Sequence, residues 1–186
     1  MTTLLGIAGS LRAGSLNRKL LQAATERTPD GVTLEIGSIA GIPLYDGDAE
    51  RDEGVPAPVE ALKDRIAAAD GLLLVTPEYN QSIPGVFKNA IDWCSRPPKD
   101  IARVFAGKPV GVIGATPGRG GTRAAQDAWL SVFRGLSLVP FLGESLYVAG
   151  AAKVFDDDGA LTDDTIARLL TEYLEAFAAF TARVGG

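Results

Sequence analysis

The sequence contains no histidine, only one cysteine, Cys94, and no dense cluster of metal ligands. Without histidine, Ser-His-Asp and Cys-His nucleophilic sites are excluded, and a single cysteine cannot build a zinc site of His and Cys ligands. The acidic run 156–158 lacks the alternating spacing of a calcium-binding loop. We therefore expect no metal site, and a carboxylate or a cofactor must supply the chemistry.

The chain also lacks a long basic run, a membrane-length apolar segment and the basic leader of a signal peptide. Its net charge of −5, from 23 acidic and 18 basic residues, argues against binding to nucleic acid or to an anionic membrane surface. One cysteine allows no intrachain disulfide, which is typical of a reducing compartment. We expect a cytoplasmic protein whose partners are small molecules, with neither nucleic acid nor membrane among them.

What the sequence does contain is 46% hydrophobic residues over 186 positions, enough for one domain with a substantial core. Apolar runs typical of buried strands alternate with segments of helical periodicity. Strands are expected at residues 4–8, 32–36, 71–75 and 108–115, with a fifth at 136–140 that is interrupted at 141–143 and continued at 146–148. Helices are expected at 16–24, 58–69, 86–95, around 129–133 and at 161–184, with an ordered loop at 37–58 and a linker at 97–103.

This alternation predicts a single α/β domain over residues 1–186. Strands joined by right-handed helical crossovers form a doubly wound parallel sheet with helices on both faces. A five-stranded sheet of order 2-1-3-4-5 brings the carboxyl ends of the first and third strands together at the topological switch point, where ligands bind in such folds.

The loop Gly9–Asn17 joins the first expected strand to the first expected helix. The first N–H groups of a helix have no internal partner and its dipole is positive there, so a phosphate is stabilised. Ser10, Ser15 and Asn17 offer donors, and the Arg12 guanidinium matches phosphate oxygens. A capped turn, with Ser15 as N-cap and Arg12 in solvent, explains the same residues equally well. Because Ser15 replaces the lysine of a triphosphate-binding loop, and the dinucleotide glycine fingerprint is absent, a monophosphate is the favoured ligand.

Two further unusual loops follow the third and fourth expected strands. Residues 76–85 contain an acid, an aromatic residue and two amides, whereas residues 116–122 are rich in glycine and can present backbone amides to a planar ligand. Taken singly, Glu78, Tyr79 and Asn80 are better explained as a solvated acid, a core aromatic residue and a turn residue. Taken together, three loops at one edge of the sheet predict one ligand site.

The residues of these loops resemble the NAD(P)H-dependent FMN reductase family, and within it most closely the quinone and chromate reductases. The resemblance covers nearly the whole chain and is carried by Gly9-Ser10-Leu11-Arg12 with Ser15 and Asn17, and by Thr76-Pro77-Glu78-Tyr79-Asn80 with Ser82, Pro84-Gly85 and Lys88-Asn89-Ala90-Ile91-Asp92-Trp93. It implies a flavodoxin-like fold with FMN as cofactor and NADPH or NADH as co-substrate. It also implies a homodimer or homotetramer.

The resemblance assigns the FMN-binding residues and leaves catalysis to the flavin. The FMN phosphate is expected at Ser10, Arg12, Ser15, Leu16 and Asn17, and the isoalloxazine ring beside Pro77, Glu78, Tyr79, Asn80, Gln81 and Ser82 and beside Thr116, Pro117, Gly118, Gly120 and Gly121. Gln81 stands where relatives often carry an aromatic residue, and Thr116 where many carry serine. Both departures bear on the shape of the acceptor pocket.

The resemblance implies hydride transfer from NAD(P)H to FMN and passage of two electrons to a quinone or a related acceptor such as chromate or an azo compound. The alternative is an FMN-binding electron carrier, or a ligand-sensing domain, without its own nicotinamide site. Such carriers tend to be strongly acidic around the flavin, whereas this chain has Arg12 and Arg119 in the loops and is only moderately acidic, which favours the enzyme.

The expected helix 86–95 is apolar over more than one face, as in a helix that is deeply buried or paired with another subunit. A monomer is expected to leave Phe87, Ile91 or Trp93 partly exposed, so we predict self-association through residues 86–93.

Overall fold

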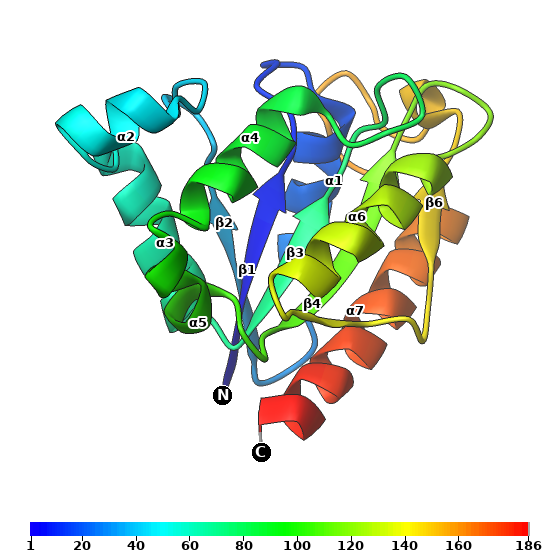
Figure 1. Ribbon diagram of the computed structural model, residues 1–186. Coiled ribbons are helices and arrows are strands. Elements are labelled where there is room, and N and C mark those ends of the chain that lie inside the picture. Colours follow the sequence, from blue (N-terminus) through cyan, green and yellow to red (C-terminus); the bar gives the residue numbers. More distant parts are fainter. Residues whose placement is uncertain (186) are drawn as a thin grey trace.

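A parallel β-sheet forms the centre of the computed structural model, which describes residues 1–185 (Figure 1). The strand order is β2-β1-β3-β4-β5, and β6 also pairs with β4. The strands are β1 (Thr2–Ala8), β2 (Val32–Gly37), β3 (Gly71–Val75), β4 (Pro109–Ala115), β5 (Val139–Pro140) and β6 (Leu146–Val148). The predicted order 2-1-3-4-5 is confirmed, and so is the interrupted fifth strand, whose place along β4 is shared by β5 and β6.

Helices cover both faces of the sheet, as predicted for a doubly wound fold. They are α1 (Leu16–Thr25), α2 (Gly47–Glu53), α3 (Ala57–Ala68), α4 (Gly85–Cys94), α5 (Ile101–Val104), α6 (Arg123–Gly135) and α7 (Asp164–Gly185), with short 3-10 turns η1 (Pro98–Asp100) and η2 (Ala151–Lys153). Helices α1 and α7 pack on one face, and α3 to α6 pack on the other. Figure 1 shows α4 and α6 in front of the sheet, with α1 behind it.

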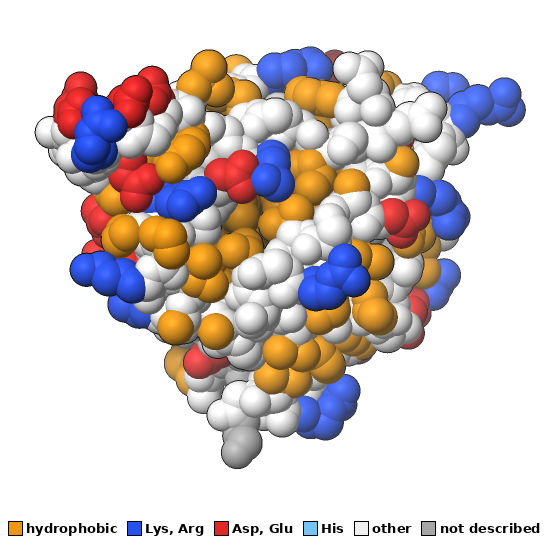
Figure 2. Space-filling model, in the orientation of Figure 1, with side chains coloured by type: hydrophobic (Ala, Val, Ile, Leu, Met, Phe, Trp, Pro, Cys, Tyr) orange, Lys and Arg blue, Asp and Glu red, His pale blue; other side chains and the backbone are white. Residues whose placement is uncertain are grey.

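Two segments expected to be irregular contain helices. The loop 37–58 includes α2, and the linker 97–103 includes η1 and α5. Asp46 is the N-cap of α2, and its carboxylate accepts a hydrogen bond from Asp48 N at 2.8 Å. Acidic residues in the first turn suit the helix dipole. It buries no residue, so it has no apolar periodicity to reveal it. Figure 2 shows the charged side chains that gather over α2.

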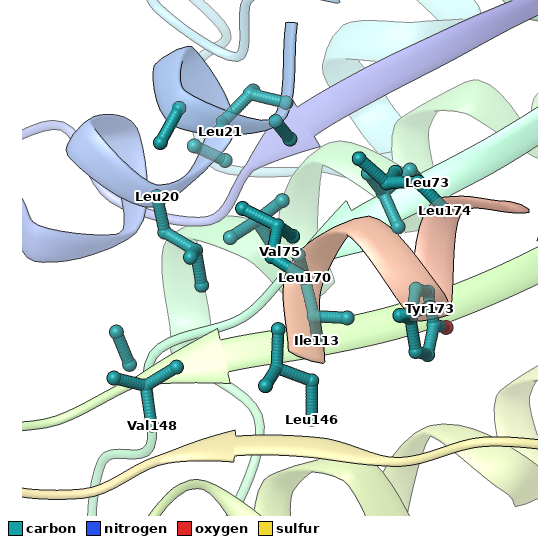
Figure 3. Close-up of a cluster of buried hydrophobic side chains, with 14 of the residues drawn as sticks. Leu20, Leu21, Leu73, Val75, Ile113, Leu146, Val148, Leu170, Tyr173 and Leu174 are labelled. Atoms are coloured by element: carbon teal, nitrogen blue, oxygen red, sulfur yellow. The ribbon is translucent and has the colours of Figure 1, made fainter. Parts of the chain in front are cut away.

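Adjacent residues of the central strands enter different hydrophobic clusters. Leu73 and Val75 face α1 and α7, whereas Leu72 and Leu74 face α3 to α6. Since successive strand side chains alternate between faces and both faces are covered, the strand is a continuous apolar run. Figure 3 shows one cluster, in which side chains of α1 and α7 converge on the sheet: Leu20, Leu21, Leu170, Tyr173 and Leu174 around Leu73, Val75 and Ile113.

The expectation that a monomer exposes the apolar side chains of α4 is wrong. Phe87, Ile91 and Trp93 are 0%, 2% and 1% exposed within the single chain. The Phe87 ring meets Trp129 of α6 edge to face at 5.0 Å, and Trp93 Nε1 donates to Pro43 O at 2.9 Å. The loop before α2 and helix α6 therefore cover the faces of α4 that point away from the sheet.

Neither a membrane-spanning helix nor a metal-binding cluster is found in the part of the chain that the structure describes. Among residues 1–185, every helix is too short or too polar to cross a membrane. The same residues contain no group of three or more His, Cys, Asp or Glu side chains close enough to hold a metal ion.

Candidate functional site

The loops that follow β1, β3 and β4 meet at the carboxyl edge of the sheet, the upper edge in Figure 1. They enclose a hollow of about 230 Å³. Its lining consists of Ser10, Arg12, Ser15, Leu16, Asn17, Pro77, Glu78, Tyr79, Ala115, Thr116 and Pro117. The predicted residues Asn80, Gln81, Ser82, Gly118, Gly120 and Gly121 lie in the same loops but outside this lining. Ala115 was missed, because the last apolar residue of a buried strand carries no sequence signal of its own.

The N-terminus of α1 presents unpaired donors to this hollow. Ser15 is the N-cap, and its Oγ accepts a hydrogen bond from Arg18 N at 3.3 Å. The N–H groups of Leu16 and Asn17 make no hydrogen bond within residues 1–185. Two free backbone donors at the positive end of a helix are the donor set that a phosphate requires.

Two side chains of the first loop supplement these amides. Ser10 is buried, and its Oγ accepts from Arg12 N at 3.4 Å, which holds the turn. The Arg12 side chain is exposed and forms no ion pair in the described part of the chain. A guanidinium that no carboxylate neutralises is available to a phosphate, so this end of the hollow fits the phosphate of FMN.

Gly9, just before these residues, is required by packing. A side chain at this position would collide with the ring of Phe87 in α4. The absence of a side chain lets the end of β1 pass directly over α4. Gly14 differs, because nothing lies within 4 Å of where its side chain would stand.

Asn17 is buried and binds the backbone of Ala115 at the end of β4 through both ends of its amide. Its oxygen accepts and its nitrogen donates, which leaves one N–H of the side chain for the hollow. Asn17 therefore joins the first loop to the third, in addition to its predicted contact with a phosphate.

The loop after β3 folds into a tight hairpin turn. Tyr79 N donates to Ser82 O and Ser82 N donates to Tyr79 O, both at 3.1 Å. The two central residues, Asn80 and Gln81, have φ values of +52° and +59°. Two left-handed residues are the geometry of a type I′ turn, which Asn tolerates well and Gln does not. The strained turn is well defined and holds Tyr79 at the rim of the hollow, 46% exposed.

Glu78 caps a helix of the neighbouring loop. Its Oε2 accepts a hydrogen bond from Ala125 N, in the first turn of α6, at 3.1 Å. The N-cap residue itself, Thr122, makes no such bond and instead accepts from Gln126 Nε2 with its hydroxyl at 3.0 Å. A carboxylate at the positive end of α6 also suits the helix dipole. Glu78 is thus a positioning residue that ties the second loop to the third.

The third loop is anchored on β6 and on the turn that follows it. Thr116 N donates to Val148 O at 2.9 Å, and Ala151 N donates to Thr116 O at 3.0 Å. The Thr116 hydroxyl accepts from Gly118 N at 3.3 Å. Serine would supply the same oxygen, so the departure from serine keeps this bond and adds a methyl group.

The hollow is built to bind rather than to carry out acid-base catalysis. Glu78 is the one carboxylate in its described lining, and Ala125 already engages it. What remains is an anion site at α1 beside two loops rich in exposed backbone, with an aromatic side chain at the rim. These groups suit a planar ligand that carries a phosphate, and such a cofactor brings its own redox chemistry.

Comparisons with known proteins agree with this geometry. Over 182 residues, the chain is 42% identical to an NAD(P)H-dependent FMN reductase of Pseudomonas aeruginosa, covering 98% of this chain and 96% of the relative. It is 38% identical over 181 residues to a quinone reductase of Escherichia coli, covering 96% and 94%. The solved structure of a flavoenzyme NAD(P)H:(acceptor) oxidoreductase of Paracoccus denitrificans superposes with a TM-score of 0.87 at 34% identity, covering 98% of each chain.

A family model described as NADPH-dependent FMN reductase matches residues 2–153, which include all three loops of the hollow. With relatives above 30% identity over nearly the full length, the chain belongs to the NADPH-dependent FMN reductase family.

Proposed function

We propose that this protein is an FMN-dependent oxidoreductase that takes a hydride from NADPH or NADH and passes two electrons to a quinone or a related small acceptor. One observation carries the proposal: unpaired amides at the N-terminus of α1 lie beside the loops that follow β3 and β4, in one hollow. The family and the quinone reductases among the relatives support the same activity.

In this proposal the first loop holds the phosphate of FMN. Ser10, Arg12 and Ser15 contribute side chains, and Leu16 and Asn17 contribute backbone N–H groups. When bound, FMN would supply the redox chemistry between the nicotinamide and the acceptor. The protein therefore has to bind, orient and shield the reactants, which agrees with a lining that offers no free acid-base pair.

The second and third loops border the ring in this proposal. Pro77, Glu78 and Tyr79 lie on one side, with Thr116 and Pro117 on the other. Five of the remaining predicted contacts are exposed in these loops and are available to a ring that extends beyond the hollow: Asn80, Gln81, Ser82, Gly118 and Gly120. Gly121, the sixth, is buried against Tyr147.

Steady-state oxidation of NADPH and NADH with a soluble quinone tests this function without any second protein. We expect purified protein with FMN to oxidise NADPH or NADH in the presence of the quinone, with no second protein added. A protein that retains FMN but oxidises neither nucleotide would instead be an electron carrier. A protein that binds no FMN would contradict both functions.

A homodimer or homotetramer remains part of the proposal, through the exposed side of the predicted helix α4 and its neighbour α6 rather than through Phe87, Ile91 or Trp93, which are buried. Val86 of α4 and Leu130 of α6 are 38% and 41% exposed, and Figure 2 shows hydrophobic side chains gathered between these two helices. Light scattering should give the mass of an oligomer, and Leu130→Asp should lower it. Leu142→Asp is the matched control, because Leu142 is also exposed but lies in the loop between β5 and β6.

We also propose that residues 1–186 form one domain and that the protein is cytoplasmic. Both hydrophobic clusters share one sheet, which supports a single folding unit.

Cys94 is a free thiol, and burial raises its pKa to about 12, so it stays protonated and unreactive in the native protein.

A further inference from the structure

A second cavity of about 470 Å³ lies on the other side of the first loop from the hollow. We call it the α1–β2 cavity, and its lining includes Ser10, Leu11, Arg18, Lys19, Ile36 and Asp158. Ser10 lines both cavities, whereas Leu11 and Ala13 face this one and Arg12 and Ser15 face the hollow. Its volume falls in the range of small-molecule sites.

Two cations of α1, Arg18 and Lys19, line the α1–β2 cavity. Neither forms an ion pair within residues 1–185, and Asp158 is the one carboxylate in the lining. Lys19 is half-buried: its stem lies against Gly159, and its Nζ donates to Asp156 O at 3.3 Å. Arg18 is exposed, and in a protein of net charge −5 two cations without carboxylate partners attract an anion to this cavity.

The position of these cations is unfavourable for the helix itself. Arg18 and Lys19 occupy the first turn of α1, which contains no acidic residue, and the last turn contains no basic one. A helix is stabilised by the opposite arrangement, because its N-terminus carries the positive end of the dipole. Ser10 lines both this cavity and the hollow. It is 7% exposed, and no described residue accepts its hydroxyl proton, so that proton is open to a ligand in either place.

Part of the lining is apolar and suits a flat hydrophobic group. Leu11 and Ile36 are 54% and 45% exposed, although both are large hydrophobic residues at the cavity. Gln22 and Ser38 add neutral hydrogen-bonding groups. The cavity therefore combines two cations, an apolar wall and a few polar groups, which matches a ligand with an anionic end and an aromatic body.

We propose that the α1–β2 cavity binds a phosphorylated nucleoside, with its phosphate at Arg18 and Lys19 and its base against Leu11 and Ile36. Two ligands share this chemistry: the adenosine 2′-phosphate end of NADPH, and a free nucleotide. NADPH as the source rests on the proposed function, whereas the binding of a phosphorylated nucleoside to this cavity does not.

The test is calorimetric titration of FMN-saturated protein with adenosine 2′,5′-bisphosphate and, as a control, with adenosine. The bisphosphate should bind and adenosine should bind at least about 10-fold more weakly. Lys19→Ala and Arg18→Ala should each lower the affinity for the bisphosphate by roughly 10-fold, which is the effect of losing one charge-assisted hydrogen bond. Arg27→Ala is the matched control, since Arg27 follows the other end of α1 and pairs with Glu26, and it should leave the affinity unchanged.

A charge reversal separates loss of binding from loss of structure. Arg18→Glu puts an acid in the first turn of α1, so the melting temperature should hold or rise while bisphosphate binding is lost. Wild-type protein that fails to bind millimolar bisphosphate, or Arg18→Glu protein that binds it as well as wild type, would overturn the proposal.

Kinetics then identify the source of the ligand. If the cavity holds the end of NADPH, Arg18→Glu raises KM for NADPH and leaves KM for NADH unchanged. If it holds a free nucleotide, both KM values stay the same although the calorimetric signal is lost. Absence of turnover with either co-substrate would count against the proposed oxidoreductase activity alone, because the titration requires no turnover.

Discussion

Asn17 and Ala115, 98 residues apart in the sequence, are joined by two hydrogen bonds that run in opposite directions. Asn17 Nδ2 donates to Ala115 O at 2.8 Å, and Ala115 N donates to Asn17 Oδ1 at 2.9 Å. Both residues are buried. The pair ties the N-terminus of α1 to the end of β4, and so connects the anion site to the third loop.

Asn17→Ala should therefore destabilise the protein and weaken FMN binding together. The substitution leaves a buried N–H and a buried C=O of Ala115 without partners, at about 1–3 kcal/mol for each unsatisfied group. Urea unfolding of the FMN-free protein measures the first effect, and a fluorescence titration with FMN measures the second. Gln22→Ala, at an exposed position of the same helix, should change neither by more than about 0.5 kcal/mol.

Arg12→Ala should weaken the binding of FMN far more than the binding of riboflavin. The phosphate of FMN carries a charge of roughly −1.5 to −2 at neutral pH, and riboflavin lacks it. Loss of one charge-assisted hydrogen bond, about 1.5–3 kcal/mol, should reduce FMN affinity by roughly 10-fold to 150-fold. Ser15→Ala should act in the same direction but less. Equal losses for FMN and riboflavin would mean that Arg12 only stabilises the turn.

Glu78→Ala should destabilise the third loop as well as its own. It removes the carboxylate that caps α6 through Ala125, and loss of a helix cap costs about 0.5–2 kcal/mol. Glu78→Gln keeps an acceptor oxygen and should recover part of the loss. Hydrogen exchange can localise the effect: the amides at the start of α6 should exchange faster in Glu78→Ala, while those of α7 should not.

Lys63 and Asp100 should make stability depend on pH in the acid range. The Lys63 side chain is fully buried and its Nζ lies 2.7 Å from Asp100 Oδ2, and this hydrogen bond lowers the pKa of Asp100. A carboxyl whose pKa is lower in the folded state stabilises the fold above its unfolded pKa of about 3.9. That contribution disappears as the pH falls through the lower, folded value.

Asp100→Asn should therefore be less stable than wild type at pH 7, and the difference should shrink below about pH 4. Urea unfolding at a series of pH values measures it. A gap that stays constant down to pH 2.5 would show that Asp100 acts through packing rather than through its charge. Asp64→Asn is a suitable control, since Asp64 pairs with Arg103 at an exposed site and should show a much smaller difference.

The sheet could be predicted because each of its central strands can be recognised from a few consecutive residues. Strands β1, β3 and β4 are short apolar runs bounded by turn residues, and their order follows from the alternation with helices. The first loop was found for the same reason, since a strand, a polar loop and a helix stand in sequence. Helix α2 was missed because it buries no residue and so has no apolar face.

The features that were not predicted depend on contacts between distant segments. The sequence of α4 shows that Phe87 and Trp93 are apolar, but not that α6 and Pro43 cover them. Likewise, nothing in residues 76–85 indicates that Glu78 caps a helix that begins at Arg123. The α1–β2 cavity arises between the first helix and the edge strand, and no motif marks it.

An anaerobic titration of the purified, FMN-loaded protein with NADPH and NADH tests the central claim most directly. The account predicts a yellow protein whose flavin absorbance bleaches with one equivalent of either or both nucleotides and returns when a soluble quinone is added. A colourless protein that binds no added FMN, or a bound flavin that neither nucleotide reduces, would contradict it.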